Sequence, residues 1–293
     1  MEQNSIVDSK GFRRLEFSSS PEIYDNSLQA WFKDMTNYDL SLMHFLFGAG
    51  AEMANELGIK TEAAHWNKLK SQLPDFDLDN EGSLTFAKGF PYNASHRHFS
   101  HALAIHPLGI IDWSDGEKAQ RIIRATLKKM NDYGPDYWTG YTYSWFANMQ
   151  ARAFNGEEAA KALRTFAKCF CLKNTFHANG DQSASGKSKF TYRPFTLEGN
   201  FAFAAGIHEM LLQSHTGVIR VFPAVPESWK NVSFNNLRAM GGFLVSAALK
   251  DGKVVRLEIY AEKGGRLAVF SPFEHKVVEY DTQPGSRIDL AVE

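Results

Sequence analysis

The sequence is poor in cysteine, which removes two common ways of building a site or a scaffold. Among 293 residues there are only two cysteines, Cys169 and Cys171, separated by one residue. This spacing matches neither a zinc knuckle nor a disulfide framework. Two helical positions that are two residues apart do not face each other, so a mutual disulfide is not expected. We interpret both cysteines as thiols packed in the core.

The sequence also lacks a surplus of positive or negative charge, and it lacks long apolar runs. Lys and Arg number 32 and Asp and Glu number 33, which gives a net charge of −1. Without a basic surplus, neither nucleic acid nor an anionic membrane is an expected partner. No apolar run reaches the roughly 18–20 residues that span a bilayer. The first residues lack the pattern of a signal peptide, so they do not indicate a compartment.

Apolar periodicity divides the chain into a helical part and a strand-rich part. It predicts helices over 38–57, 61–72, 116–130, 142–154, 157–172 and 201–213. Consecutive helices joined by short turns are the repeating unit of α/α toroids, which usually need about twelve helices. The sequence therefore predicts a mainly α protein, with an incomplete (α/α) toroid of the six-hairpin type over residues 1–215.

The remaining segment, residues 216–293, alternates apolar and polar positions between turn dipeptides. The pattern predicts strands over 218–222, 243–249, 254–261, 266–270, 276–280 and 287–292. Six short strands with tight turns predict a small antiparallel β-sandwich domain. No group of catalytic residue types occurs there, so we expect a structural role for this domain.

Glu22 is the first candidate for acid–base chemistry. Pro21 and the preceding serines place it in a loop, close in sequence to Tyr24 and Trp31. Aromatic surroundings disfavour the charged form of a carboxyl and raise its pKa, as a general acid requires. The alternative is an ordinary surface glutamate.

Three histidines with an arginine form the second candidate, namely His96, Arg97, His98 and His101. Imidazole and guanidinium groups supply the fixed donors and acceptors that a neutral sugar needs. Structural histidines and a metal site are the alternatives, although no carboxylate or cysteine accompanies the cluster. The isolated histidines elsewhere are interpreted as structural.

Glu198 is the third candidate, because it precedes a predicted helix together with Gly199 and Asn200. A helix N-terminus favours a carboxylate, and glycine permits close approach of the backbone. Glu22 and Glu198 together would form the carboxyl pair that glycoside hydrolysis needs. The alternative for Glu198 is a helix cap.

Several motifs carry a resemblance to a known family, and they follow one another in that family's order. They are Ser20-Pro21-Glu22, Asn37-Tyr38-Asp39, His96-Arg97-His98-Phe99-Ser100-His101, Glu198-Gly199-Asn200-Phe201 and Val221-Phe222-Pro223-Ala224-Val225-Pro226. Taken together they resemble glycoside hydrolase family 95, whose activities are α-L-fucosidase and α-L-galactosidase.

The resemblance implies an inverting reaction without a cofactor or metal. Glu22 would be the general acid, and an acidic residue at position 198 would orient an asparagine that activates water. The sugar pocket would include His96, Arg97, His98, His101 and Asn200. The substrate would be an oligosaccharide or glycan, and the family is typical of exported, periplasmic or extracellular proteins.

Two departures from the family pattern leave alternatives open. The family has Asp where this chain has Glu198. Its water-activating asparagines and its N-terminal β-domain precede the Ser-Pro-Glu motif, so the chain is expected to be a fragment or a truncated product. The alternatives are a non-catalytic carbohydrate-binding relative that associates with itself or with the missing portion, and a different toroid enzyme such as a polysaccharide lyase.

Overall fold

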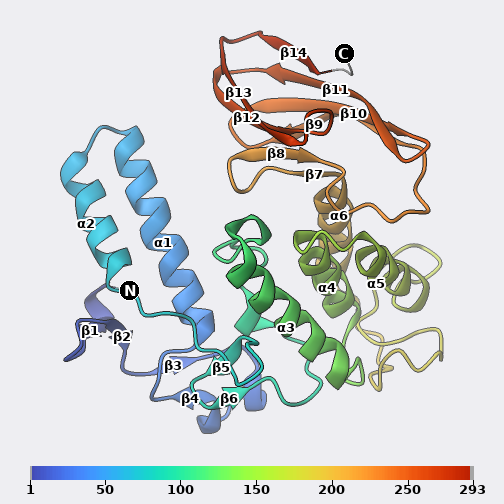
Figure 1. Cartoon of the computed structure of the whole chain (residues 1–293). Helices are drawn as coiled ribbons and strands as arrows, with labels where there is room; N and C mark the ends of the chain where they lie inside the picture. The colour runs from blue at the N-terminus through green and yellow to red at the C-terminus, as the bar shows by residue number, and fades with distance from the viewer. Residues whose placement is uncertain (1, 291–293) are drawn as a thin grey trace. The chain divides into compact units, whose positions relative to one another are not determined.

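The computed structural model describes residues 2–290, which divide into two compact units (Figure 1). Among the described residues, the first unit comprises residues 2–142 and 186–190, and the second comprises residues 143–185 and 191–290. This division does not coincide with the predicted domain boundary between residues 215 and 216. That boundary stays a prediction.

The described part of the first unit contains the α-helices α1 to α3, short 3-10 helices and small two-stranded sheets. Its helices are α1 (Asn37–Glu56), α2 (Lys60–Ser71) and α3 (Glu117–Tyr133). Its strands are β1 (Ser5–Val7), β2 (Arg13–Leu15), β3 (Ser18–Ser19), β4 (Trp31–Phe32), β5 (Thr85–Ala87) and β6 (Phe90–Pro91). The pairs β1–β2, β3–β4 and β5–β6 are each antiparallel.

Helices α1 and α2 form a hairpin that begins with a side-chain cap (Figure 1). The Thr36 hydroxyl accepts a hydrogen bond from the Asp39 amide at 3.2 Å, which satisfies a donor at the start of α1. Gly50 faces the partner helix: a Cβ there would lie 2.9 Å from the ring of Trp66. The absence of a side chain at Gly50 therefore allows α1 and α2 to approach closely.

The helices of the second unit are α4, α5 and α6. Helix α4 (Gly140–Arg152) starts in the first unit, and α5 (Gly156–Cys169) and α6 (Glu198–Leu211) follow. A buried pair joins α4 to α6, because Arg152 donates two hydrogen bonds to Glu209 at 2.6 and 2.8 Å. Both cysteines are free; Cys169 is buried in α5, whereas Cys171 lies beyond the helix and is only half-buried. The prediction of a core position is wrong for Cys171, since the helix ends before it.

Eight strands complete the second unit. They are β7 (Leu212–Gln213), β8 (Val218–Val221), β9 (Val232–Ala239), β10 (Phe243–Lys250), β11 (Lys253–Ala261), β12 (Gly265–Ser271), β13 (Lys276–Thr282) and β14 (Arg287–Leu290). They form two four-stranded sheets, in the orders β14-β11-β10-β9 and β13-β12-β8-β7. All pairs are antiparallel except β8 with β12, which is parallel. The predicted last strand extends to residue 292, and its end lies outside the described residues.

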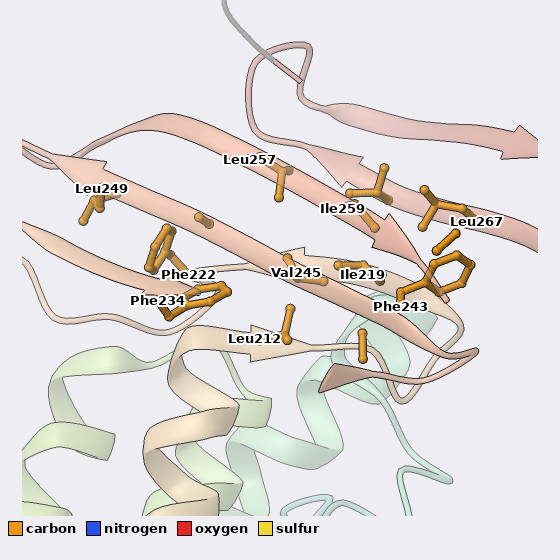
Figure 2. Packing of buried hydrophobic residues seen from close by; sticks show 14 residues of the cluster. Leu212, Ile219, Phe222, Phe234, Phe243, Val245, Leu249, Leu257, Ile259 and Leu267 are labelled. Carbon is orange, nitrogen blue, oxygen red and sulfur yellow. The ribbon is translucent and has the colours of Figure 1, made fainter. Parts of the chain in front are cut away.

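The two sheets share one hydrophobic core (Figure 2). Phe222 and Phe234 lie with their ring centroids 5.3 Å apart, and Val245 and Leu257 are fully buried beside them. In β11 and β12 the buried side chains occupy alternate positions, as expected for a sandwich. A helical region followed by a β domain is therefore confirmed. The parallel β8–β12 pair corrects the expectation of a wholly antiparallel sandwich.

Candidate active site

Glu22 lies in a tight loop between the paired strands β3 and β4. Its φ angle is 57°, and Tyr24, Asp25 and Asn26 also have positive φ. Non-glycine residues seldom adopt this region, and such strain persists only where the surroundings impose it. Here the Glu22 amide donates to the Asn26 side chain at 3.0 Å. The loop therefore holds Glu22 in a specific, strained conformation.

The loop is also tied to the histidine cluster. The hydroxyls of Ser20 and Ser100 lie 2.6 Å apart, and both residues are buried. This contact brings together two segments that are 80 residues apart in the chain. It places Glu22 beside Arg97 and His98.

The Glu22 carboxylate has two cationic or polar hydrogen-bond donors beside it. The Arg97 guanidinium donates to Oε2, and His98 Nε2 lies 3.0 Å from the same oxygen. Glu22 and the histidine cluster therefore lie together within the first unit. Such charge-assisted contacts fix the direction of the carboxylate.

These contacts reverse the expected pKa shift of Glu22. Burial disfavours ionisation, but the charges and hydrogen bonds of His98 and Arg97 outweigh it, so the pKa of Glu22 lies below its ordinary value. The prediction of a raised pKa is therefore wrong. Its physical reason was an aromatic environment, whereas the side chains of Tyr24 and Trp31 are exposed.

His96 contacts the backbone of Glu22. Its Nδ1 accepts from the His98 amide at 3.1 Å, so the proton belongs on Nε2, which lies 3.2 Å from the Glu22 carbonyl oxygen. Burial lowers the pKa of His96, and it also lowers that of His98 against the pull of the Glu22 carboxylate. His96 is thus a neutral donor that holds the Glu22 backbone.

His101 has different surroundings. It is fully buried, with its ring stacked on Tyr92 at 5.0 Å and against Phe86 at 4.7 Å. Burial lowers its pKa to about 3. Its assignment to sugar binding stays a prediction, and it would require these rings to move.

Glu198 is the first residue of α6, in the second unit, and its side chain is exposed. The residue preceding α6, Leu197, provides no side-chain cap. Gly199 is buried against His177: a Cβ there would lie 2.5 Å from His177 Nδ1. The start of α6 therefore requires glycine, and it directs Glu198 away from this contact toward solvent.

Asn200 connects α6 to the preceding loop. Its oxygen accepts from the His177 amide at 3.1 Å, and its nitrogen donates to the Thr175 carbonyl at 3.0 Å. The Thr196 hydroxyl lies 2.7 Å from His177 Nδ1. Asn200 thus holds the loop in place, so its assignment to substrate binding stays a prediction. Because Glu22 and Glu198 belong to different units, their meeting also stays a prediction.

Two features of the site were not anticipated from the sequence. His177, interpreted as an isolated structural histidine, is the residue against which α6 packs at Gly199. Asn26 was not singled out, although an asparagine four residues after Glu22 in a loop can bond a nearby backbone amide. Asn26 holds the backbone of Glu22, and His177 packs against the residue that follows Glu198.

The chain matches two models of a known family. A family model described as the glycosyl hydrolase family 95 catalytic domain matches residues 3–211. The chain belongs to glycoside hydrolase family 95. A second model, the glycoside hydrolase family 95 C-terminal domain, matches residues 213–289. The family assignment made from the motifs is confirmed, and it favours a hydrolase over a lyase.

Two curated relatives give the same indication. "Alpha-L-fucosidase 2" of Arabidopsis thaliana is 31% identical over 232 residues, which cover 77% of this chain and 27% of the relative. "Probable alpha-fucosidase A" of Aspergillus niger is 23% identical over 247 residues, which cover 80% of this chain and 28% of the relative. The chain thus spans little more than a quarter of the length of these relatives.

Within residues 2–290, no three His, Cys, Asp or Glu side chains gather in a way that could hold a metal ion. Over the same residues, no helix has the length and apolar character needed to cross a membrane.

Proposed function

We propose that this chain contributes the acid side of an inverting α-L-fucosidase or α-L-galactosidase site, with Glu22 as the general acid. The observation that carries the proposal is the contact of Glu22 with both Arg97 and His98. A carboxyl that must reach a glycosidic oxygen has to be held in one direction, and these two donors supply that constraint. Membership of the glycoside hydrolase family supports the reaction class.

In the proposed step, water attacks the anomeric carbon while the bond from that carbon to the glycosidic oxygen breaks. Glu22 gives its proton to the leaving oxygen, and the proton of the attacking water passes to the base side of the pocket. We assign Glu198 to that side, which requires the two carboxyls to face the same sugar from opposite directions. His96, Arg97 and His98 would bind sugar hydroxyls.

The lowered pKa of Glu22 has a consequence for this step. A general acid acts only while protonated, and the pKa of Glu22 in the sugar-free chain lies below its usual range. Binding of a neutral sugar that draws Arg97 away from the carboxylate would raise that pKa. Substrate binding and proton donation would then be coupled through Arg97.

The fold proposed for this site is part of an (α/α) toroid. Its support is the packing of α1 against α2, and the succession of α4 and α5 across a short turn. We also propose that the protein is exported, as the family resemblance implies. A glycan is the proposed substrate.

Hydrolysis of aryl α-L-fucoside and aryl α-L-galactoside by the chain tests the proposal. We expect release of the aryl alcohol, loss of release in Glu22→Gln, and strong reduction in Glu198→Gln. Retained activity in Glu22→Gln, with unchanged secondary structure, would exclude Glu22 as the acid. Proton NMR of the first-formed sugar distinguishes inversion from retention.

A second candidate is a partner-dependent relative that is inactive alone. Exposed apolar residues favour it: Phe45 and Met53 on α1, and Leu57 directly after α1, are 50%, 65% and 72% exposed. A helix face this apolar usually marks an interaction surface. Sedimentation at increasing concentration tests it: self-association that Met53→Glu and Leu57→Glu abolish supports this candidate, and a monomer at all concentrations opposes it.

A further inference from the structure

A cavity of about 910 Å³ lies in the second unit, between the turn that joins α4 to α5 and one end of the β-sandwich. Phe154 lines it from the turn, and the segment around Trp229 and Lys230 lines it from the other side. Its size is within the range of about 300–1,000 Å³ that small-molecule sites occupy. None of its lining residues belongs to the candidate active site.

Aromatic rings and one arginine form the inner part of the cavity. The Arg220 guanidinium lies 4.9 Å from the ring centre of Phe270 and 6.0 Å from that of Phe154. Trp229 and Phe273 line the same space, and both are only partly buried. Flat aromatic faces of this kind suit the C–H faces of a pyranose ring, whose hydroxyls project sideways toward polar groups.

The cavity carries a surplus of positive charge. Arg220, Lys230 and Lys253 line it, against the single carboxylate of Glu227. Of these cations, Lys230 and Lys253 are exposed. Lys230 and Lys253 therefore present their charge to whatever occupies the cavity, and an anionic group is the complementary ligand.

The walls are held in place by specific backbone contacts. A Cβ at Gly156 would lie 2.5 Å from the backbone of Val225, so the two walls meet in direct contact. The Glu227 amide donates to Glu157 at 2.7 Å, and the Gly252 amide donates to the Lys230 carbonyl at 2.9 Å. The cavity is therefore formed before any ligand binds.

Backbone strain gathers at the same place. Three of the lining residues, Phe154, Phe222 and His275, have φ values of 55°, 52° and 54°. Bulky residues seldom adopt this region, and where they do the strain clusters at binding sites. These residues belong to three separate segments, so one strained turn does not account for the pattern.

We propose that this cavity is an accessory binding site for an acidic oligosaccharide, such as a uronate-bearing segment of a polysaccharide. The aromatic rings would stack on sugar rings, and Arg220, Lys230 and Lys253 would bind the carboxylates. Membership of a glycoside hydrolase family makes a glycan chain the expected anionic ligand. The site is independent of Glu22 and of the proposed hydrolytic step.

Titration of the chain with tetragalacturonate, followed by calorimetry and by tryptophan fluorescence, tests the proposal. The matched probe is the same tetrasaccharide with its carboxyl groups reduced to alcohols. We expect saturable binding of the acid form, weakening with added salt, and at least about tenfold weaker binding of the neutral form.

Two variants locate the site. Trp229→Ala, and the double change Lys230→Gln with Lys253→Gln, should each weaken binding by about tenfold or more. The matched control is Lys250→Gln with Lys263→Gln, which removes the same charge from exposed positions that do not line the cavity. Because both lysines of the cavity variant are exposed, it should fold normally, and circular dichroism checks this.

Three results would overturn the proposal. They are the absence of binding, equal weakening by the control variant, and equal affinity for the neutral tetrasaccharide. A change in tryptophan fluorescence that depends on protein concentration, and not on the saccharide, would also overturn it, since a second copy of the chain would then fill the cavity.

Discussion

The ionisation of Glu22 depends on Arg97 and His98, which reach it from a distant part of the chain. Together they favour the carboxylate over the carboxylic acid, although burial acts in the opposite direction. Burial lowers the pKa of His98, which reduces the positive charge that His98 carries near neutral pH. Arg97 should therefore dominate the protonation state of the candidate acid near neutral pH.

Replacing Arg97 by Met should raise the pKa of Glu22. Because the pKa of Glu22 is lower in the folded than in the unfolded chain, its ionisation stabilises the folded state at pH values above the unfolded-state pKa, near 4.5. This contribution is lost as the pH falls through the folded-state pKa. Without the guanidinium the carboxyl will take up its proton at higher pH. Carbon NMR titration of the Glu22 carboxyl measures the midpoint. Arg121→Met, which removes an exposed arginine paired with Glu117, is the control. An unchanged midpoint in Arg97→Met would contradict the electrostatic account.

Replacing Arg152 by Met should destabilise the fold by about 3 kcal/mol or more, because it leaves the largely buried Glu209 carboxylate without its bidentate partner. Urea denaturation measures the loss. Arg238→Met breaks a pair of similar geometry with Glu262 on the exposed surface, and little or no change is expected there. Equal effects of the two changes would show that burial does not govern these pairs.

At the scale of elements, α1 and α2 associate because Gly50 admits the Trp66 ring. Phe47 lies beside that ring, with centroids 5.9 Å apart, and contributes to the buried cluster of the hairpin. Gly48 lies two residues earlier on the same helix, where a Cβ would meet only the end of the Lys70 side chain, at 3.4 Å. The two glycines therefore have different roles, one in packing and one without a packing role.

Alanine at these two positions should shift stability in opposite directions. Gly48→Ala is expected to stabilise by up to about 1 kcal/mol, since alanine is the better helix former and Lys70 can move. Gly50→Ala should destabilise by about 1–3 kcal/mol, since the rigid indole ring must shift. Denaturant midpoints of the two variants give the comparison. A gain in stability with Gly50→Ala would mean that the hairpin is looser than its packing indicates.

Local sequence was sufficient to predict the helices but not every strand. The periodicity of α1 and the caps around it set its bounds to within one residue at each end. Strand β9 was missed because its exposed asparagines resemble a loop, and only pairing with β10 makes it a strand. The sequence also predicts that the last helix extends to residue 213. In the structure, α6 ends at Leu211 because residues 212–213 pair with β8.

The candidate site shows the same limit more sharply. Residue types and spacing identified Glu22 and the histidines, because those residue types carry the chemistry. The direction of the Glu22 pKa shift could not be predicted, since it depends on a contact between segments 75 residues apart. The strained conformation of the Glu22 loop likewise comes from tertiary contacts such as Ser20 with Ser100.

At the scale of the whole molecule, buried histidines should make stability depend on pH. His101 is enclosed by aromatic rings, and burial lowers its pKa to about 3; burial also lowers the pKa of His177 to about 4. In the unfolded chain a histidine takes up a proton near pH 6.5, whereas these two stay neutral in the folded state. The unfolded state therefore binds more protons between about pH 6.5 and 4, and stability must fall as the solution becomes more acidic.

Replacing His101 by Phe should reduce this dependence while preserving the aromatic cluster of Phe86 and Tyr92. Each histidine of this kind contributes a slope of about 1.4 kcal/mol per pH unit, so the variant should lose that much of the slope between pH 6 and 4.5. Urea denaturation at several pH values measures it. Phe86→Leu, in the same cluster but without a titrating group, should lower stability and leave the slope unchanged. If His101→Phe keeps the wild-type slope, His101 must be protonated within the fold, and it would then need a hydrogen-bond acceptor, as a sugar-binding role would also require.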